Sequence, residues 1–156
     1  MIREATVEDA ADIVRLIRAL ADYEREPDAV ANTPELVERW LFGDDAVASA
    51  LVAETDGQVV GIAVWYRSHS TCTGVPGIYL EDLFVDPEQR GTGLGRALLE
   101  ALAGIAVDRG YARFEWVVLD WNTPAIEFYE SLGAGPMQEW TTYRVDGEQL
   151  AVLAGR

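Results

Sequence analysis

Apolar residues recur with helical spacing in the first third of the chain. Thr6 resembles an N-cap with Asp9 at the capping-box position, which predicts that a helix begins there. The residues that follow at i, i+3, i+4 and i+7 and predict one buried face are Ile13, Leu16, Ile17 and Leu20. Thr33 followed by Pro34 predicts the start of a second helix.

The middle of the chain has the pattern of strands. Residues 50–54 and 59–66 are rich in Val, Ile and Ala, and the Asp56-Gly57 pair between them predicts a hairpin turn. A loop rich in Ser, Thr and Gly follows, and residues 77–85 predict a third strand. A short strand at residues 2–5 precedes all of these.

The last third predicts two helices and two strands. The helices cover residues 94–109 and 124–132, ended by Gly110 and Gly133, and the strands cover residues 113–119 and 139–145. The order β-α-α-β-β-β-α-β-α-β predicts an α/β fold, with one mixed sheet flanked by helices. Without an internal repeat, low-complexity tract or linker, residues 1–156 are expected to form a single domain.

Composition narrows the class of protein. A chain of 156 residues with 49% hydrophobic and 10% aromatic residues has enough apolar surface for an ordered core. No apolar run reaches the length of a membrane span, and the N-terminus lacks the features of a signal peptide. One cysteine excludes an internal disulfide and a cysteine-rich zinc site, and we expect no metal. A cytoplasmic location is the plain expectation.

The formal net charge of −15 disfavours nucleic acid as a partner, because phosphate binding needs a basic surface. Two explanations of the charge remain. It would attract a cationic substrate over long range, or it would serve solubility alone.

A glycine-rich turn stands between the third strand and the helix at residues 94–109. Backbone N–H groups at such a turn bind phosphate groups. The Walker A loop is excluded because no Lys followed by Ser or Thr comes after the second glycine, and the dinucleotide fingerprint fails because Arg96 stands where its third glycine would be. In the segment Gln89-Arg90-Gly91-Thr92-Gly93-Leu94-Gly95, the six residues from Arg90 to Gly95 instead have the form Q/R-x-x-G-x-G/A. A turn without any ligand is the alternative.

This loop resembles the acyl-CoA pyrophosphate loop of the GNAT superfamily of N-acetyltransferases, and the resemblance extends from Ile2 to about Val145. Within the superfamily, the chain is most similar to the diamine (spermidine/spermine) acetyltransferases and their thialysine-acetylating relatives. The blocks that carry the similarity are residues 2–6 with 20–24, residues 79–85, the glycine loop, and residues 121–134.

The resemblance implies acetyl-CoA as cofactor and a set of residues around it. Backbone groups of Leu83 and Val85 would bind the pantetheine arm beside a splay between strands, the glycines would wrap the pyrophosphate, and Asn122 would hydrogen-bond the cofactor. The full set of implied cofactor-binding residues is Leu83, Phe84, Val85, Arg90, Gly91, Thr92, Gly93, Leu94, Gly95, Arg96, Asn122, Pro124, Ala125 and Tyr129.

The resemblance also implies a pocket for a cationic amine. Tyr23 and Glu24 would line it, and Glu81 would face the amine. The implied substrate-binding residues are Tyr23, Glu24, Glu81, Asp82 and Glu139. Glu139 is the candidate for an acidic residue near the last strand, and the loop before it is shorter than in the diamine enzymes, a departure that argues against polyamine specificity. The relatives are homodimers, and residues 150–153 would supply a strand or packing at such an interface.

An alkyl ammonium group, with a reference pKa of about 10.4, must lose a proton before it attacks a thioester. Glu81 is the candidate base, directly or through a water, and an exposed edge carboxylate is the alternative. Because side chains alternate along a strand, Glu81 and Asp82 are expected on opposite faces, so that only one can be the base. Tyr129 is the candidate proton donor to the thiolate, with core packing as the alternative.

His69 and Cys72 lie three residues apart in an irregular loop with no third group to orient them, so we expect no nucleophilic cysteine. The sequence predicts an acetyl-CoA-dependent N-acetyltransferase that acts by direct attack of a small cationic amine. A polyamine or diamine leads, and a Lys-like or thialysine-like amino acid is the alternative. A non-catalytic acyl-CoA-binding protein and an acetyltransferase of lysine-rich proteins are the further alternatives.

Overall fold

The computed structural model describes residues 1–156, and the chain divides into two compact units, residues 1–117 and 118–156. The first unit holds one five-stranded sheet in the order β1-β2-β3-β4-β5. Its strands are β1 (Ile2–Glu4), β2 (Ser49–Thr55), β3 (Gln58–His69), β4 (Pro76–Val85) and β5 (Phe114–Glu115). The first four strands pair antiparallel and β4 pairs parallel with β5, which confirms the predicted mixed sheet.

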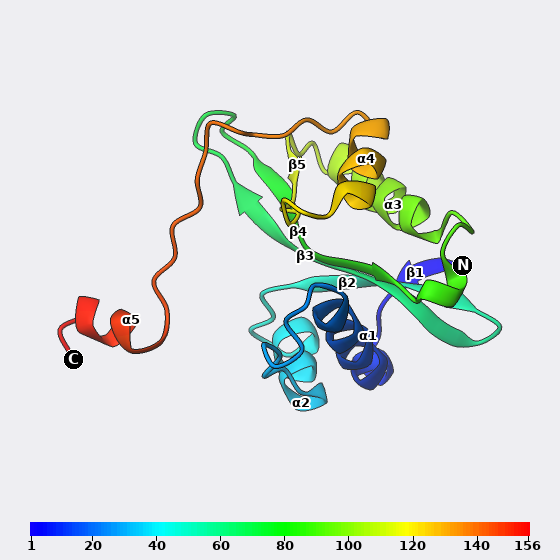
Figure 1. The fold of residues 1–156 in the computed structure, drawn as a ribbon, viewed down its shortest axis with the longest axis horizontal. Helices are drawn as coiled ribbons and strands as arrows, with labels where there is room; N and C mark the ends of the chain where they lie inside the picture. The colour runs from blue at the N-terminus through cyan, green and yellow to red at the C-terminus, as the bar shows by residue number, and fades with distance from the viewer. The chain divides into compact units, whose positions relative to one another are not determined.

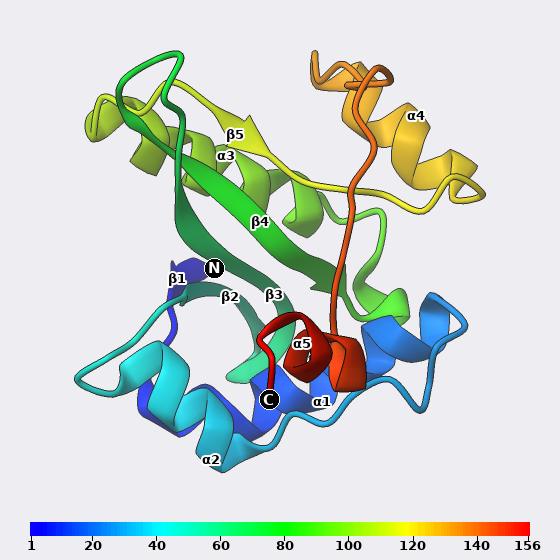
Figure 2. The same cartoon turned by 90° about the vertical axis from the view of Figure 1, so that its left-hand side faces the viewer.

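The helices of the first unit cover both faces of this sheet (Figures 1 and 2). They are α1 (Ala10–Tyr23), α2 (Pro34–Val37) and α3 (Leu94–Asp108), with short helices η1 (Val7–Asp9), η2 (Glu38–Phe42) and η3 (Pro87–Gln89). α1 and α2 lie on one face and α3 lies on the other (Figure 1). Side chains from β2, β3 and β4 pack with those of α1 and α2 in one buried core, which includes Ile13, Leu16, Val37, Val52, Ile62, Val64 and Phe84.

The predicted capping box at Thr6 and the predicted hairpin turn at Asp56-Gly57 are both present in the structure. The backbone N–H of Thr6 donates to the Asp9 carboxylate at 2.7 Å, and Arg3 binds the same carboxylate, which ties β1 to the start of the first helix. Asp56 and Gly57 both have positive φ angles, as a two-residue hairpin turn between β2 and β3 requires. The hairpin, the caps and the helix at residues 94–108 are therefore confirmed.

The second unit contains α4 (Thr123–Ser131) and α5 (Gly147–Leu153). Residues 132–146 between them form neither helix nor strand, so the predicted strand at residues 139–145 is wrong. A strand needs a neighbour for its backbone hydrogen bonds, and this chain supplies none there. Trp140 and Tyr143 in this segment are 78% and 94% exposed. The chain then ends in a helix instead of a strand.

The strand expected at residues 113–119 is also shorter than predicted, because only Phe114 and Glu115 pair with β4. In addition, no helix in the structure combines the length and the apolar character that a membrane crossing requires.

Candidate active site

The turn between β4 and α3 has the backbone geometry of an anion cradle. Gly91 and Gly93 have φ angles of 77° and 86°, in the left-handed region that glycine adopts without strain. Gly93 is the N-cap of α3 and brings no side chain to cap it, so the first-turn N–H groups of the helix have no side-chain acceptor there. The hydroxyl of Thr92 donates to the Gln89 carbonyl at 2.5 Å and closes the turn.

The residues of this turn fit a pyrophosphate group. A Cβ added at Gly91 or Gly93 would meet open space, and one added at Gly95 would first meet the Val85 side chain, at 3.9 Å. The space beside these three glycines is therefore open. The positive end of the α3 dipole adds a favourable field for negative charge at the same place.

A β-bulge interrupts β4 just before this turn. Trp65 of β3 pairs with Leu80, and the preceding residue, Val64, pairs with Asp82. Glu81 is therefore one extra residue on β4, with no partner on β3. A bulge of this kind breaks the alternation of side chains along the strand.

The expectation that Glu81 and Asp82 lie on opposite faces is wrong for this reason. Asp82 pairs with Val64, which belongs to the core under α1. Tyr66 lies two residues after Val64 and stacks on Tyr79, so both tyrosines share that face. Glu81 lies two residues after Tyr79 and takes the same face. The bulge thus places both carboxylates on the α1 side of the sheet.

Three carboxylates meet on this face, and we call Glu24, Glu81 and Asp82 the carboxylate cluster. Burial, as the largest cause, and the negative charges of Glu81 and Glu24 together raise the pKa of Asp82 to about 6. Burial also raises the pKa of Glu24, which follows the last residue of α1. Glu81 itself is exposed. A cationic group placed among these carboxylates would relieve their mutual repulsion.

Two tyrosines that the sequence did not single out adjoin the cluster. The rings of Tyr66 and Tyr79 stack with centroids 5.0 Å apart and an angle of 28° between their planes. Burial raises the pKa of both phenols, and the charge of Glu81 adds to the effect. The sequence signal that could have found them is the hairpin register, which places position 66 opposite position 79.

The edge of β4 opens beside the cluster. The parallel pairing with β5 ends at Tyr79, whereas β4 continues to Val85. Leu83 and Val85, the residues expected to offer backbone groups to a pantetheine arm, lie on this later part of β4. The early end of this pairing is compatible with the expected splay between neighbouring strands, which stays a prediction.

The remaining predicted residues lie in the second unit. Asn122 is the N-cap of α4 and is buried, and its side-chain oxygen accepts from the Ala125 N–H at 3.4 Å. Pro124 lies in the first turn of α4. Tyr129 is partly buried on the same helix, with its ring 5.6 Å from that of Phe128.

The structure thus groups the predicted site residues in two sets. Tyr23, Glu24, the acidic residues of β4 and the glycine loop belong to the first unit, and the α4 residues belong to the second. Glu139 is exposed in the segment without regular structure that follows α4.

A mixed sheet with a bulged fourth strand, followed by a glycine turn that opens a helix, agrees with the fold that the resemblance to the GNAT acetyltransferases implies. The family model described as "Acetyltransferase (GNAT) family" matches residues 13–134. The chain belongs to this family, and it is an N-acetyltransferase. Enzymes of the family use acetyl-CoA as the acyl donor.

Relatives cover the chain at full length. The thialysine N-epsilon-acetyltransferase of Sus scrofa is 39% identical over 100% of this chain and 98% of its own. The spermidine/spermine N(1)-acetyltransferase-like protein 1 of Homo sapiens is 32% identical over 98% of this chain, which spans 23% of that protein. Among solved structures, an integron cassette protein of V. cholerae superposes with a TM-score of 0.85 at 27% identity, over 100% of this chain and 98% of its own.

Proposed function

We propose that this enzyme transfers the acetyl group of acetyl-CoA directly to a primary amine of a small cationic substrate. The observation that carries the proposal is the carboxylate cluster. It lies on β4 and at the end of α1, and β4 leads along the chain into the glycine turn. A negative site of this kind attracts an ammonium group. The family model spans residues of both units, which supports our expectation that they act as one acetyltransferase domain.

The glycine turn and the start of α3 would hold the pyrophosphate through backbone N–H groups, and the open edge of β4 at Leu83 and Val85 would hold the pantetheine arm. Asn122, Pro124 and Ala125 at the start of α4 are the other residues that we propose as cofactor ligands. Bound acetyl-CoA supplies the activated thioester carbonyl that the amine attacks.

Glu81 would remove the proton from the substrate ammonium, directly or through a water. Its exposure keeps it open to the substrate. Glu24 and Asp82 would hold the positive charge of the substrate, and Tyr23 would line the pocket. Tyr129 would hold a proton at its hydroxyl for the departing sulfur. These roles need no covalent intermediate on the protein, and Cys72 lies exposed in the β3–β4 loop.

Two substrate classes fit this site, and each has a specific observation in its favour. The several carboxylates suit a polyamine or diamine, which carries more than one positive charge. The identity of 39% over full length to an enzyme named for thialysine favours an amino acid with a terminal aminoalkyl chain. Both classes present an alkyl ammonium group to Glu81.

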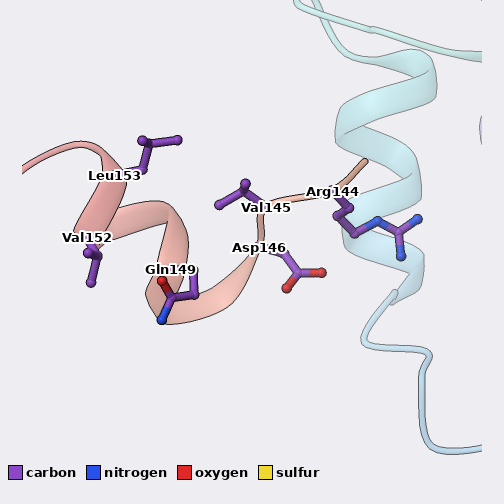
Figure 3. A pocket seen from close by; sticks show the side chains of 6 residues that line it. All are labelled: Arg144, Val145, Asp146, Gln149, Val152 and Leu153. Carbon is purple, nitrogen blue, oxygen red and sulfur yellow. The ribbon is translucent and has the colours of Figure 1, made fainter. Parts of the chain in front are cut away.

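We also propose a homodimer in which the C-terminal segment, residues 144–153, lies at the interface. Val145, Val152 and Leu153 line a hollow at α5 together with Arg144, Asp146 and Gln149 (Figure 3). Val152 and Leu153 are 66% and 75% exposed, and Trp140 is exposed before them. Apolar groups gathered in this way are typical of a surface that another chain covers.

The test of the function is thiol release from acetyl-CoA with spermidine, spermine, putrescine, lysine and thialysine as acceptors. Turnover on at least one of these amines supports the proposal, and the ratio of kcat/KM values between polyamines and lysine analogues decides the class. If acetyl-CoA protects the protein against heat but no amine of this panel is acetylated, the proposed substrate class is wrong.

A further inference from the structure

Arg90 lies between the end of β4 and the glycine turn, and its sequence position places it among the predicted pyrophosphate ligands. In the structure, its guanidinium carbon lies 5.0 Å from the centre of the Tyr23 ring and 5.4 Å from the centre of the Phe84 ring. Its Nε donates to the Val85 carbonyl at 3.3 Å. The side chain thus contacts the end of α1 and the end of β4 at once.

These contacts suit a planar cation. A guanidinium group is attracted to the faces of aromatic rings, and its flat shape lets it stack there while its N–H groups reach an acceptor. Tyr23 is the last residue of α1 and the neighbour of Glu24. The contact with Tyr23 therefore links the glycine loop to the helix end that carries one member of the carboxylate cluster.

We propose that Arg90 is a positioning residue for the amine site and not a phosphate ligand. It holds the Tyr23 ring against the end of β4, and in this way it fixes Glu24 next to Asp82, with which Glu24 interacts. The proposal rests on the proposed function, since it assumes that the amine binds at the carboxylate cluster. The pyrophosphate is then left to the backbone donors of the turn.

The variant Arg90→Met keeps an apolar side chain and removes the positive charge. A positioning role and a phosphate-binding role for Arg90 predict changes in different constants of this variant. As a positioning residue, Arg90 supports only the amine, and we expect the KM for the amine to rise about three- to tenfold. The Kd for acetyl-CoA, measured by calorimetry without amine, is expected to remain that of the unaltered enzyme. A weaker acetyl-CoA Kd with an unchanged amine KM would overturn the proposal.

Arg90→Lys separates shape from charge. A phosphate ligand can be replaced by Lys, which binds phosphate as a point charge. A stacked guanidinium is replaced poorly, because an ammonium group has no flat face and does not offer the same fork of donors. We expect Arg90→Lys to recover only part of the loss in amine KM. Full recovery would contradict the role of stacking.

Arg39→Met is the matched control. The Arg39 guanidinium lies 4.4 Å over the ring of Trp40 and pairs with Asp45, so the variant removes a similar cation–ring contact away from Tyr23 and the carboxylate cluster. We expect it to change neither constant. An equal rise of amine KM in this variant would mean that loss of one positive charge from the protein is sufficient.

A double-mutant cycle tests whether Arg90 acts through Tyr23. If it does, adding Arg90→Met to Tyr23→Leu raises the amine KM no further than Tyr23→Leu alone. Additive losses would contradict the mechanism. The same cycle read from urea midpoints of unfolding needs no substrate. If no amine is acetylated, the proposed function fails, whereas non-additive midpoints with an unchanged acetyl-CoA Kd still support the contact, and additive midpoints overturn it.

Discussion

At the scale of residues, the bulge in β4 sets the position of the proposed base, because it leaves Glu81 exposed and on the same face as Asp82. We predict that Glu81→Gln lowers kcat about 10²- to 10⁴-fold, the range of a positioned base. The amide cannot accept the ammonium proton, so the acidic limb of the pH–rate profile should also shift. The measurement is kcat and kcat/KM from pH 5 to 9.

Glu38→Gln, which removes an exposed carboxylate from η2, is the control for the change in net charge. It should leave both rate constants unchanged. Equal kinetics of Glu81→Gln and the unaltered enzyme at every pH would mean that Glu81 is an ordinary surface carboxylate.

Asp82 gives a prediction for stability. Its pKa rises to about 6 on folding, above the value of about 3.9 for an exposed Asp, so the folded state binds more protons between these values. The free energy of unfolding therefore falls as the pH rises from about 4 to about 6. Asp82→Asn removes this penalty, and we expect the variant to be more stable at pH 8 by up to about 3 kcal/mol, and to gain nothing at pH 4.

Urea unfolding at pH 4, 6 and 8 measures this effect. The exposed Asp44, altered to Asn, controls for the loss of one negative charge from an acidic protein. A difference between Asp82→Asn and the unaltered protein that is the same at all three pH values would refute the titration of Asp82 as its cause.

The sequence could name Glu81 and Asp82 because their position before a glycine turn is a local pattern. It could not place them on one face, because the bulge arises from the pairing of β4 with β3. No residue type in β4 indicates that the strand has one more residue than its partner at this point. Tyr66 and Tyr79 were missed for the same reason. Their contact depends on the register of two strands, which is a long-range property.

At the scale of elements, the signals that were read correctly are short-range ones. Caps, the Asp-Gly hairpin and the glycine stops act within a few residues, and the helices and hairpin they predicted are present. The strand at 113–119 was too long and the strand at 139–145 was wrong, because strand pairing depends on a neighbour that the local sequence does not reveal. The glycine turn belongs with the short-range signals.

This turn gives a prediction at the same scale. Gly93 holds a φ of 86°, and an alanine there costs about 1–2 kcal/mol of stability because its Cβ crowds the following carbonyl. Relief of this strain by a shifted backbone would misplace the N–H groups at the start of α3, so we expect Gly93→Ala to weaken acetyl-CoA binding as well. Urea unfolding and calorimetry measure the two effects.

Gly104→Ala is a control on the same helix. Gly104 lies within α3, and a Cβ added there meets nothing within 4 Å. Alanine favours the helix by up to about 1 kcal/mol over glycine, so this variant should be more stable and bind acetyl-CoA normally. Normal acetyl-CoA affinity in Gly93→Ala, despite lower stability, would remove the turn from the cofactor site.

At the scale of the whole molecule, 27 acidic and 12 basic residues give the chain its charge of −15. The structure concentrates three of the carboxylates on the α1 side of β4, where their effect on Asp82 is direct. This local arrangement supports a cationic substrate more strongly than the net charge does, because overall charge serves solubility in any case. The proposed class of substrate therefore rests on the bulge and the end of α1, and the composition only agrees with it.

The exposed apolar residues of the C-terminal segment also concern the whole molecule, because exposed apolar surface does not stabilise a monomer and is typical of an interface with another chain. We predict that light scattering gives twice the chain mass of 17.2 kDa at micromolar concentration. Leu153→Glu places a charge on a side chain that is 75% exposed in the single chain, and burial of that charge in a dimer would be unfavourable, so this variant should shift the mass towards the monomer. Val47→Glu, at a loop residue that is 65% exposed, should remain dimeric. A mass of 17.2 kDa for the unaltered protein would rule out the dimer, and a dimer that persists in Leu153→Glu would place its interface elsewhere on the chain.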